Sequence, residues 1–328
     1  MIVAFVLSGA QIAFLRASIY QEICFWAASF GALFVAGAVS GCLRGFSRKT
    51  LTVMALACAG ALLTRVSVAV GLFAAFGLLA ALHLWQSRRK LDRYVQGHAG
   101  AVAILIVAVA LTALINIALW GNPLTFADYS LYNFNVEYPD RIARTLRYGL
   151  FNLERLPFGL AYYFLPLWAF RGADGQLLLS GMRERLIDSA ELPPSSFFLT
   201  DPLLLLLAAM GIAWLVRRAA PVRFRWKALL MLVGLAAAPL LMLTAISMNY
   251  RYRMDFYAGL EFAAFLGLIA LASGPGISRS GPRRWLIAAA VAGILCSHAT
   301  MLLYKLGDFG PGERQLRDGI AAYYADKL

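Results

Sequence analysis

Charged side chains are scarce in this chain, and acidic ones are the scarcer kind. Only 14% of its 328 residues are charged, with 17 Asp and Glu against 30 Lys and Arg. Soluble domains are about one-quarter charged and about half apolar, whereas this chain is 61% hydrophobic with a mean hydropathy of +0.70. The shortage of charge excludes a domain whose solvent is water.

Histidine and cysteine are also few. The three histidines are far apart in the sequence and have no Cys, His or Asp companions at metal-ligand spacing, so no protein-encoded metal site is predicted. The four cysteines lie in apolar segments without CxxC spacing, which is typical of small buried hydrophobic side chains. These residues are His83, His98 and His298, and Cys24, Cys42, Cys58 and Cys296.

Apolar runs of about 15 to 22 residues alternate with short arginine-rich connections, and about 20 apolar residues are needed to cross a bilayer as a helix. Seven runs predict membrane crossings, at 23–43, 68–86, 99–119, 202–216, 228–248, 256–272 and 285–304. Two shorter apolar segments, 1–15 and 51–63, are of uncertain depth. The first has no basic region and no small-residue cleavage site, so it is not a secretory signal. The sequence therefore predicts an all-α polytopic bundle of about seven to nine membrane segments.

Fifteen basic residues lie in or beside the short connections, and one topology places all of them on the same side of the membrane. This explains the net charge of +13 without nucleic acid, because the basic residues do not line one soluble face with interleaved aromatics. We expect a multi-pass protein of the plasma (inner) membrane whose basic loops are cytoplasmic. They are Arg44, Arg48, Lys49, Arg88, Arg89, Lys90, Arg93, Arg217, Arg218, Arg223, Arg225, Lys227, Arg279, Arg283 and Arg284.

The same topology divides the chain into four parts: an N-terminal transmembrane bundle at 1–119, a large extracytoplasmic loop at 120–201, a C-terminal bundle at 202–304 and an extracytoplasmic tail at 305–328. Within the loop, 150–170 is apolar but interrupted by charges and prolines, which favours a helix at the interface over a crossing one. Segment 183–192 predicts a short charged helix.

Charge close to a span is costly, so three places are candidate functional sites. Before the first long span, Arg16 and Glu22 either face a polar cavity or anchor the helix at the interface. Between two short apolar segments, Arg65 either holds a phosphate bidentately or marks a tight turn.

The third place is NYRYRMDF at 249–256, where Tyr250, Arg251, Arg253 and Asp255 precede a span. Positive charge is disfavoured on the short outer loops, so an anion-binding cluster explains it. An aromatic belt with self-neutralising ion pairs is the alternative. Glu261, farther inside that span, is expected to find a hydrogen-bond donor within the bundle.

Three segments also carry a resemblance to a known family. FLRASIYQEICFW at 14–26 resembles the entry to a middle helix, ACAGALLTR at 57–65 resembles a helix pair, and YRYR at 250–253 resembles a late element. In this order they resemble motifs of the GT-C superfamily of polytopic membrane glycosyltransferases, which includes protein O-mannosyltransferases and aminoarabinose transferases.

The resemblance implies transfer of a sugar from a polyprenyl-phosphate donor to an extracytoplasmic lipid, polysaccharide or protein acceptor. Carried over to this chain, it makes Arg65, Arg251 and Arg253, with Tyr250, candidates for binding the donor phosphate. In the family, an aspartate of the first large outer loop acts as a base or metal ligand, so the resemblance also allows a divalent metal, although the sequence makes no cofactor evident.

That family loop precedes the segment resembling 14–26, and this sequence begins only about 15 residues before Arg16. The expected acid is therefore missing. We expect either a fragment of a longer chain, a protein that has lost catalysis, or a substitute carboxylate. The substitutes are Glu22, Asp128, Asp140 and Asp255. The alternative function is a non-catalytic membrane protein, either a transporter or an assembly partner, although two related halves typical of transporters are not visible.

Overall fold

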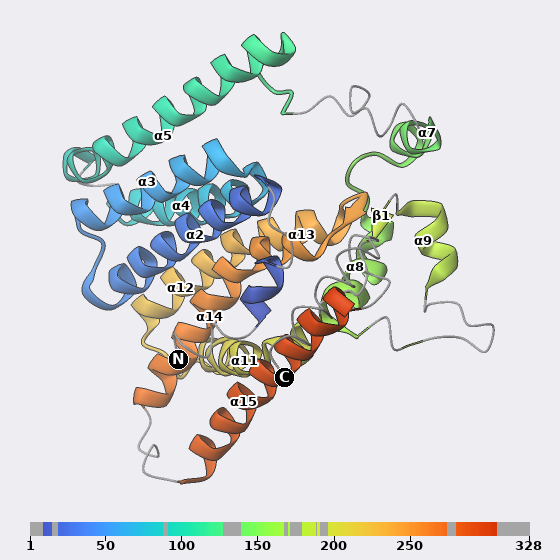
Figure 1. Ribbon diagram of the computed structural model, residues 1–328. Coiled ribbons are helices and arrows are strands. Elements are labelled where there is room, and N and C mark those ends of the chain that lie inside the picture. The colour runs from blue at the N-terminus through green and yellow to red at the C-terminus, as the bar shows by residue number, and fades with distance from the viewer. Residues whose placement is uncertain are drawn as a thin grey trace, which may run out of the picture.

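The computed structural model describes residues 9–14, 19–87, 91–126, 139–166, 170, 179–187, 189–190, 196–273 and 280–306 (Figure 1). The long helices are α2 (Ile19–Arg44), α3 (Arg48–Thr64), α4 (Val66–Gln86), α5 (Leu91–Trp120), α11 (Pro202–Val216), α12 (Val222–Leu235), α14 (Met254–Ser273) and α15 (Ser280–Leu306). The shorter elements are η1 (Gly9–Phe14), α7 (Pro139–Tyr148), η3 (Leu153–Arg155), α8 (Leu156–Phe164), α9 (Ser180–Leu186), β1 (Ser189–Ala190), α10 (Phe197–Thr200), α13 (Ala237–Thr244), β2 (Ser247–Met248) and η5 (Tyr250–Arg253).

Six of these helical segments are long and apolar enough to cross a membrane, which confirms the all-α, membrane-embedded class. They are Glu22–Arg44, Val66–Gln86, Val95–Trp120, Val222–Thr244, Tyr250–Ser273 and Arg284–Leu302. The seventh expected crossing is α11, whose 15 residues extend only about 22 Å at 1.5 Å per residue. The hydrocarbon core is about 30 Å thick, so seven crossings stay a prediction.

Three of the four basic connections meet at one end of the bundle, which we call the basic end. The Arg48 side chain donates a hydrogen bond from Nε to the Gln96 carbonyl at 2.6 Å, joining the connections that follow α2 and α4. Lys227 Nζ, on the first turns of α12, lies 5.4 Å from the centroid of the Phe46 ring. These contacts agree with the prediction that the short arginine-rich loops share one side.

Two histidines that are distant in the sequence also meet there. Nδ1 of His83 and Nε2 of His98 are 3.2 Å apart, because α4 and α5 form an antiparallel hairpin that brings residues 15 positions apart side by side. Separation along the sequence therefore does not keep this pair apart in space. Among the described residues, no three His, Cys, Asp or Glu side chains lie close enough to hold a metal ion.

The opposite end, which we call the loop end, holds α7, α8, α9 and β1 (Figure 1). The predicted span 228–248 ends early here, at Thr244, because Ser247 and Met248 pair with Ser189 and Ala190 in a two-residue parallel ladder. That span is also broken between α12 and α13. Pro239 has no N–H to bond the carbonyl of Leu235, which interrupts the helical ladder.

The loop itself is more fragmented than the sequence suggests. The expected charged helix at 183–192 is wrong at both ends, since α9 covers 180–186 and is followed by β1. The expected interfacial helix at 150–170 is reduced to the nine residues of α8, and this length is too short to cross a bilayer. Pro166, two residues after the last residue of α8, cannot extend the helix. Asp128 and the tail after residue 306 lie outside the described residues.

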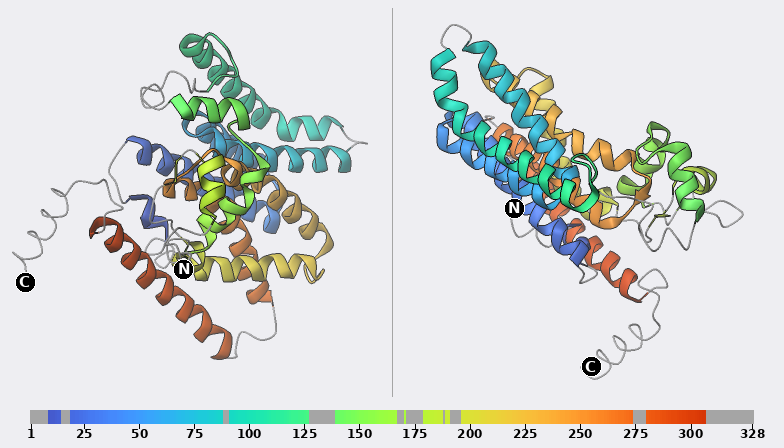
Figure 2. Two further views of the ribbon diagram at one scale, coloured as in Figure 1. Left: turned by 90° about the vertical axis from the view of Figure 1, so that its right-hand side faces the viewer. Right: turned by 90° about the horizontal axis from the view of Figure 1, so that it is seen from above.

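The two predicted transmembrane bundles pack as one body. A single cluster of buried side chains joins α2, α4, α12 and α14, including Phe34, Leu72, Leu235 and Phe262. Small residues permit the closest approaches: a Cβ on Gly211 would overlap the backbone of Ala263, and one on Gly267 would overlap that of Leu207. Helices in lipid commonly associate through such contacts. α5 and α15, the least buried spans, lie at opposite edges of the bundle (Figure 2).

Candidate functional site at the loop end

The α3–α4 junction provides the first part of the site. Thr64 ends α3, and Arg65 adopts an extended conformation with φ −149° and ψ 104° before α4 begins at Val66. The backbone N–H of Arg65 still donates to the Ala61 carbonyl at 2.7 Å. A single residue therefore turns the chain between two helices, so the arginine side chain is fixed at their shared end.

Arg65 forms an ion pair with Asp255, on the first turn of α14. Oδ2 of Asp255 accepts from Nε at 2.9 Å and from Nη2 at 2.7 Å, and Oδ1 accepts a short hydrogen bond from the Ser67 hydroxyl. The side chain of Asp255 is 0% exposed and that of Arg65 is 16% exposed. Burial alone would lower the pKa of Arg65, but the carboxylate of Asp255 raises it above the ordinary arginine value.

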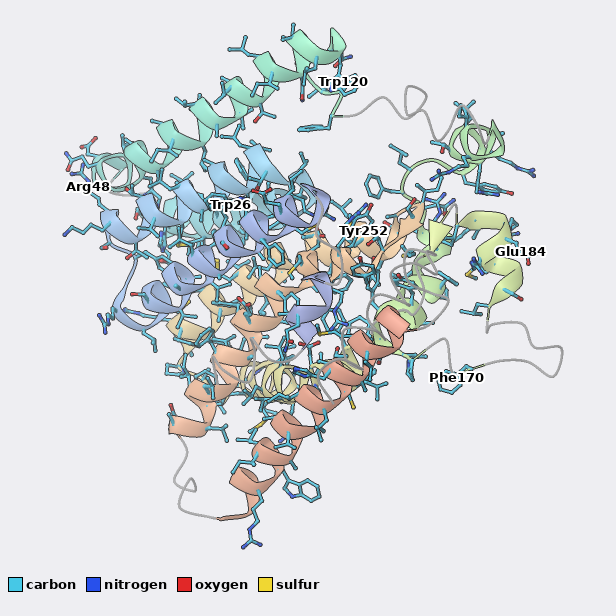
Figure 3. All side chains as sticks on the ribbon, in the orientation of Figure 1. Trp26, Arg48, Trp120, Phe170, Glu184 and Tyr252 are labelled. Carbon is cyan, nitrogen blue, oxygen red and sulfur yellow. The ribbon has the colours of Figure 1, made fainter. Side chains whose placement is uncertain are left out.

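A second arginine joins this pair across an aromatic ring. The guanidinium carbon of Arg65 is 4.7 Å from the centroid of the Tyr252 ring, and that of Arg251 is 5.5 Å from the same centroid. Both distances are within the range of cation–π attraction. Figure 3 labels Tyr252 between the helix bundle and the loop elements. Two cations and one carboxylate thus converge on a tyrosine, leaving a net positive charge among these side chains.

Arg253 lies in a separate and fully buried pair. Its Nη2 forms a short ion pair with Asp201 and donates to the Thr200 hydroxyl at 2.7 Å. The phenol of Tyr257 donates to Asp201 at 3.3 Å, and the ring of Phe197 lies 4.2 Å from the guanidinium carbon. Nε and Nη1 of Arg253 are buried without a hydrogen-bond partner. The short 3₁₀ helix η5 therefore separates its two arginines, placing Arg251 near Arg65 and Arg253 beside Asp201.

Arg155 attaches the large loop to the end of a span. This arginine is 0% exposed and donates to four backbone carbonyls, from Gly149, Leu150, Leu186 and Thr244, at 2.8 to 3.2 Å. The four acceptors come from three separate segments of the chain. Arg155 thereby fixes the start of η3, the end of α9 and the end of α13 relative to one another.

Sequence reasoning missed both Arg155 and Asp201 as site residues. Asp201 had a recognisable signal, because an acidic side chain directly before a long apolar run must sit at the end of a span. Arg155 had none, since its partners are backbone carbonyls that no side-chain pattern reveals. Of the predicted residues, the structure brings Arg65, Arg251 and Asp255 together around Tyr252, and it buries Tyr250 and Arg253.

The other candidate acids are placed differently. Glu22 is exposed on the first turn of α2 and accepts a hydrogen bond from the Trp26 indole at 3.5 Å. Asp140 belongs to α7, but its side chain is outside the described part of the structure. Glu261 has no hydrogen-bond donor among the described residues, contrary to the expectation that it finds one within the bundle. The residue as a whole is half-buried within α14.

The beginning of α2 lies beside the arginines of the site. Cys24 is buried in the same side-chain cluster as Met242, Met254 and Tyr257, and the side chain of Tyr252 packs against that cluster. Glu22, two residues earlier, is exposed and lies on a different face of α2 from the buried Cys24. In comparisons with known proteins, no family, curated protein sequence or solved structure matches this chain.

Proposed function

We propose that the loop end binds the phosphate of a polyprenyl-phosphate sugar and supports transfer of the sugar to an acceptor on the extracytoplasmic side. The observation that carries this proposal is the convergence of Arg65 and Arg251 on Tyr252, beside the buried carboxylate of Asp255. Surplus positive charge at the end of membrane helices is costly unless it has an anion to bind. A lipid-linked phosphate supplies that anion at membrane depth.

Arg251 is the residue best suited to contact the phosphate. It is half-buried, and its guanidinium group lies over the Tyr252 ring at the end of the bundle. Arg65 contributes charge while its Nε and Nη2 remain on Asp255. Arg253 and Tyr250, both fully buried, support the position of η5 in this proposal and do not touch the donor.

Asp255 is poorly suited to be a general base, because three donors from Arg65 and Ser67 already occupy its two oxygens. Glu22 is the better substitute among the described candidates. It is exposed near the start of α2, and within the described part of the chain it accepts a hydrogen bond only from the Trp26 indole. In the proposed reaction Glu22 accepts the proton of the acceptor hydroxyl while Arg251 stabilises the departing phosphate.

Binding is tested in nanodiscs with a short-chain polyprenyl phosphate as the probe. We expect Arg251→Gln to weaken binding about tenfold to a hundredfold, since a hydrogen bond to a charged group contributes about 1.5 to 3 kcal/mol. Arg185→Gln is the matched control, because Arg185 is an exposed arginine of the loop that pairs with Glu154. Equal affinity of both variants and the original protein would refute phosphate binding at Arg251.

Transfer is tested separately, with a radiolabelled polyprenyl-phosphate sugar and membrane extract as the acceptor source. We expect Glu22→Gln to abolish transfer and to leave probe binding unchanged. Both oxygens of Asp255 already accept hydrogen bonds, and this favours one other function. In that function the site binds a lipid phosphate without catalysis, as an assembly partner would. If binding depends on Arg251 but the original protein transfers no sugar, the non-catalytic function replaces the glycosyltransferase proposal.

A further inference from the structure

The segment from α7 to η3 carries exposed apolar side chains beside a basic helix face. Leu146 is 83% exposed and Leu153 is 79% exposed, and Leu150 and Phe151 between them are also exposed. Large apolar side chains exposed side by side mark a surface that contacts another apolar phase. We call the surface made by Leu146, Leu150, Phe151 and Leu153 the apolar edge.

The apolar edge is attached directly to the end of a membrane span. The backbone N–H of Ile246 donates to the Leu150 carbonyl at 2.9 Å, and Phe151 and Ala245 form an antiparallel bridge. The span ends at Thr244. Ala245 and Ile246, which pair with the apolar edge, are therefore the first two residues beyond the span. Leu150 and Phe151 consequently lie at the depth where the hydrocarbon gives way to headgroups.

α7 is an amphipathic helix whose apolar face contributes Leu146 to the apolar edge. Arg141, Arg144 and Arg147 are spaced three residues apart and share one face, while Ile142 and Leu146 lie on the other. Gly149 ends the helix in the left-handed conformation, with φ +72° and its N–H donating to Thr145 at 2.8 Å. This turn leads from the apolar face of α7 straight into Leu150.

We propose that α7 and the apolar edge lie in the membrane interface and bind anionic lipid headgroups, with the leucines in the acyl boundary and the arginines at the phosphates. Basic amphipathic helices bind bilayers in this way. The charge is complementary to anionic lipid, and the surface continues that of an adjoining span. A soluble acidic partner would match the arginines but would not bury Leu150 and Phe151 at the depth of the span end. The proposal is independent of sugar transfer.

The test places a polarity-sensitive fluorophore on single cysteines of the full chain in nanodiscs. Cys296→Ala removes the one native cysteine that is not buried. The labelled positions are Leu146→Cys and Leu153→Cys on the proposed surface, and Glu184→Cys on exposed α9 as the control. With phosphatidylglycerol discs, we expect blue-shifted emission and weak iodide quenching at 146 and 153, and water-like emission with strong quenching at 184.

The contribution of charge is measured with the Leu146→Cys label. Each Lys or Arg near an anionic surface contributes about 1 kcal/mol, so Arg147→Gln should reduce the ratio of buried to exposed label about fivefold. Arg185→Gln should leave the ratio unchanged, and phosphatidylcholine discs should lower it for the original protein. The same water-like emission at 146, 153 and 184 would overturn the proposal. If the labels at 146 and 153 are buried to the same degree with Arg147→Gln and in phosphatidylcholine discs, the proposed binding of anionic headgroups is overturned.

Discussion

The pair formed by Arg65 and Asp255 predicts an unequal cost for losing either partner. Asp255 is 0% exposed, and within the described part of the chain its donors are Arg65 and Ser67 alone, so Arg65→Met leaves a buried carboxylate without its counter-charge. Such a loss costs about 3 to 5 kcal/mol of unfolding free energy. Asp255→Asn is milder, about 1 to 3 kcal/mol, because the amide oxygen still accepts a hydrogen bond and Arg65 is 16% exposed.

The double variant Arg65→Met/Asp255→Met provides the decisive comparison. Removing both charges leaves neither buried alone, and apolar replacement of a buried pair is often neutral or stabilising. We therefore expect the double variant to be more stable than Arg65→Met by itself. Unfolding free energies are measured in detergent micelles by denaturant titration, followed by circular dichroism and tryptophan fluorescence.

Arg185→Gln provides the baseline for an exposed pair. Arg185 and Glu154 are 3.2 Å apart with side chains 59% and 60% exposed, so losing this pair costs about 0 to 1 kcal/mol. The reasoning about burial is wrong if Arg65→Met costs no more than Arg185→Gln. It is also wrong if the cost of the double variant equals the sum of the costs of Arg65→Met and Asp255→Met measured singly, since partners in contact should couple.

Three further predictions follow from close contacts. Gly267→Ala should lower the unfolding free energy by about 1 to 3 kcal/mol through overpacking, whereas Gly77→Ala, with open space around its Cβ position, should not; equal effects would contradict the contact. Arg155→Gln should speed limited proteolysis of the loop by detaching it from Thr244, and an unchanged cleavage rate would show that other contacts hold it. Asn249→Ala removes the side-chain oxygen that accepts from the Arg251 N–H at 3.1 Å, and it should lower the unfolding free energy by about 1 kcal/mol in the same titration. An unchanged unfolding free energy would show that this cap does not stabilise the protein.

Helices were predictable wherever a run of apolar residues was about long enough to cross the hydrocarbon core of a membrane. Segments 68–86 and 202–216 match α4 and α11 closely, because an apolar helix ends where charge or a cap begins. The end of 228–248 was not predictable. Its last four residues leave the helix, and Ser247 and Met248 among them pair with Ser189 and Ala190. A contact with a segment so far away in sequence has no local signal.

The candidate site was predictable in part for a similar reason. Arg65 and Asp255 were singled out because charge beside a span is costly, but nothing in the sequence paired them across 190 positions. The two arginines of YRYR looked equivalent in the sequence. They differ in the structure because η5 is a tight 3₁₀ turn, which directs Arg251 to Tyr252 and Arg253 to Asp201.

The one-residue turn at Arg65 also has a consequence for the order in which the protein is made. α3 and α4 must be positioned together as a hairpin, since only Arg65 separates them. The carboxylate partner of Arg65, Asp255, is synthesised 190 residues later. At about 5 to 20 residues per second this delay is about 10 to 40 s. During that interval the unfinished chain carries a cation close to lipid without Asp255, and the arrival of α14 is the step that completes the N-terminal half.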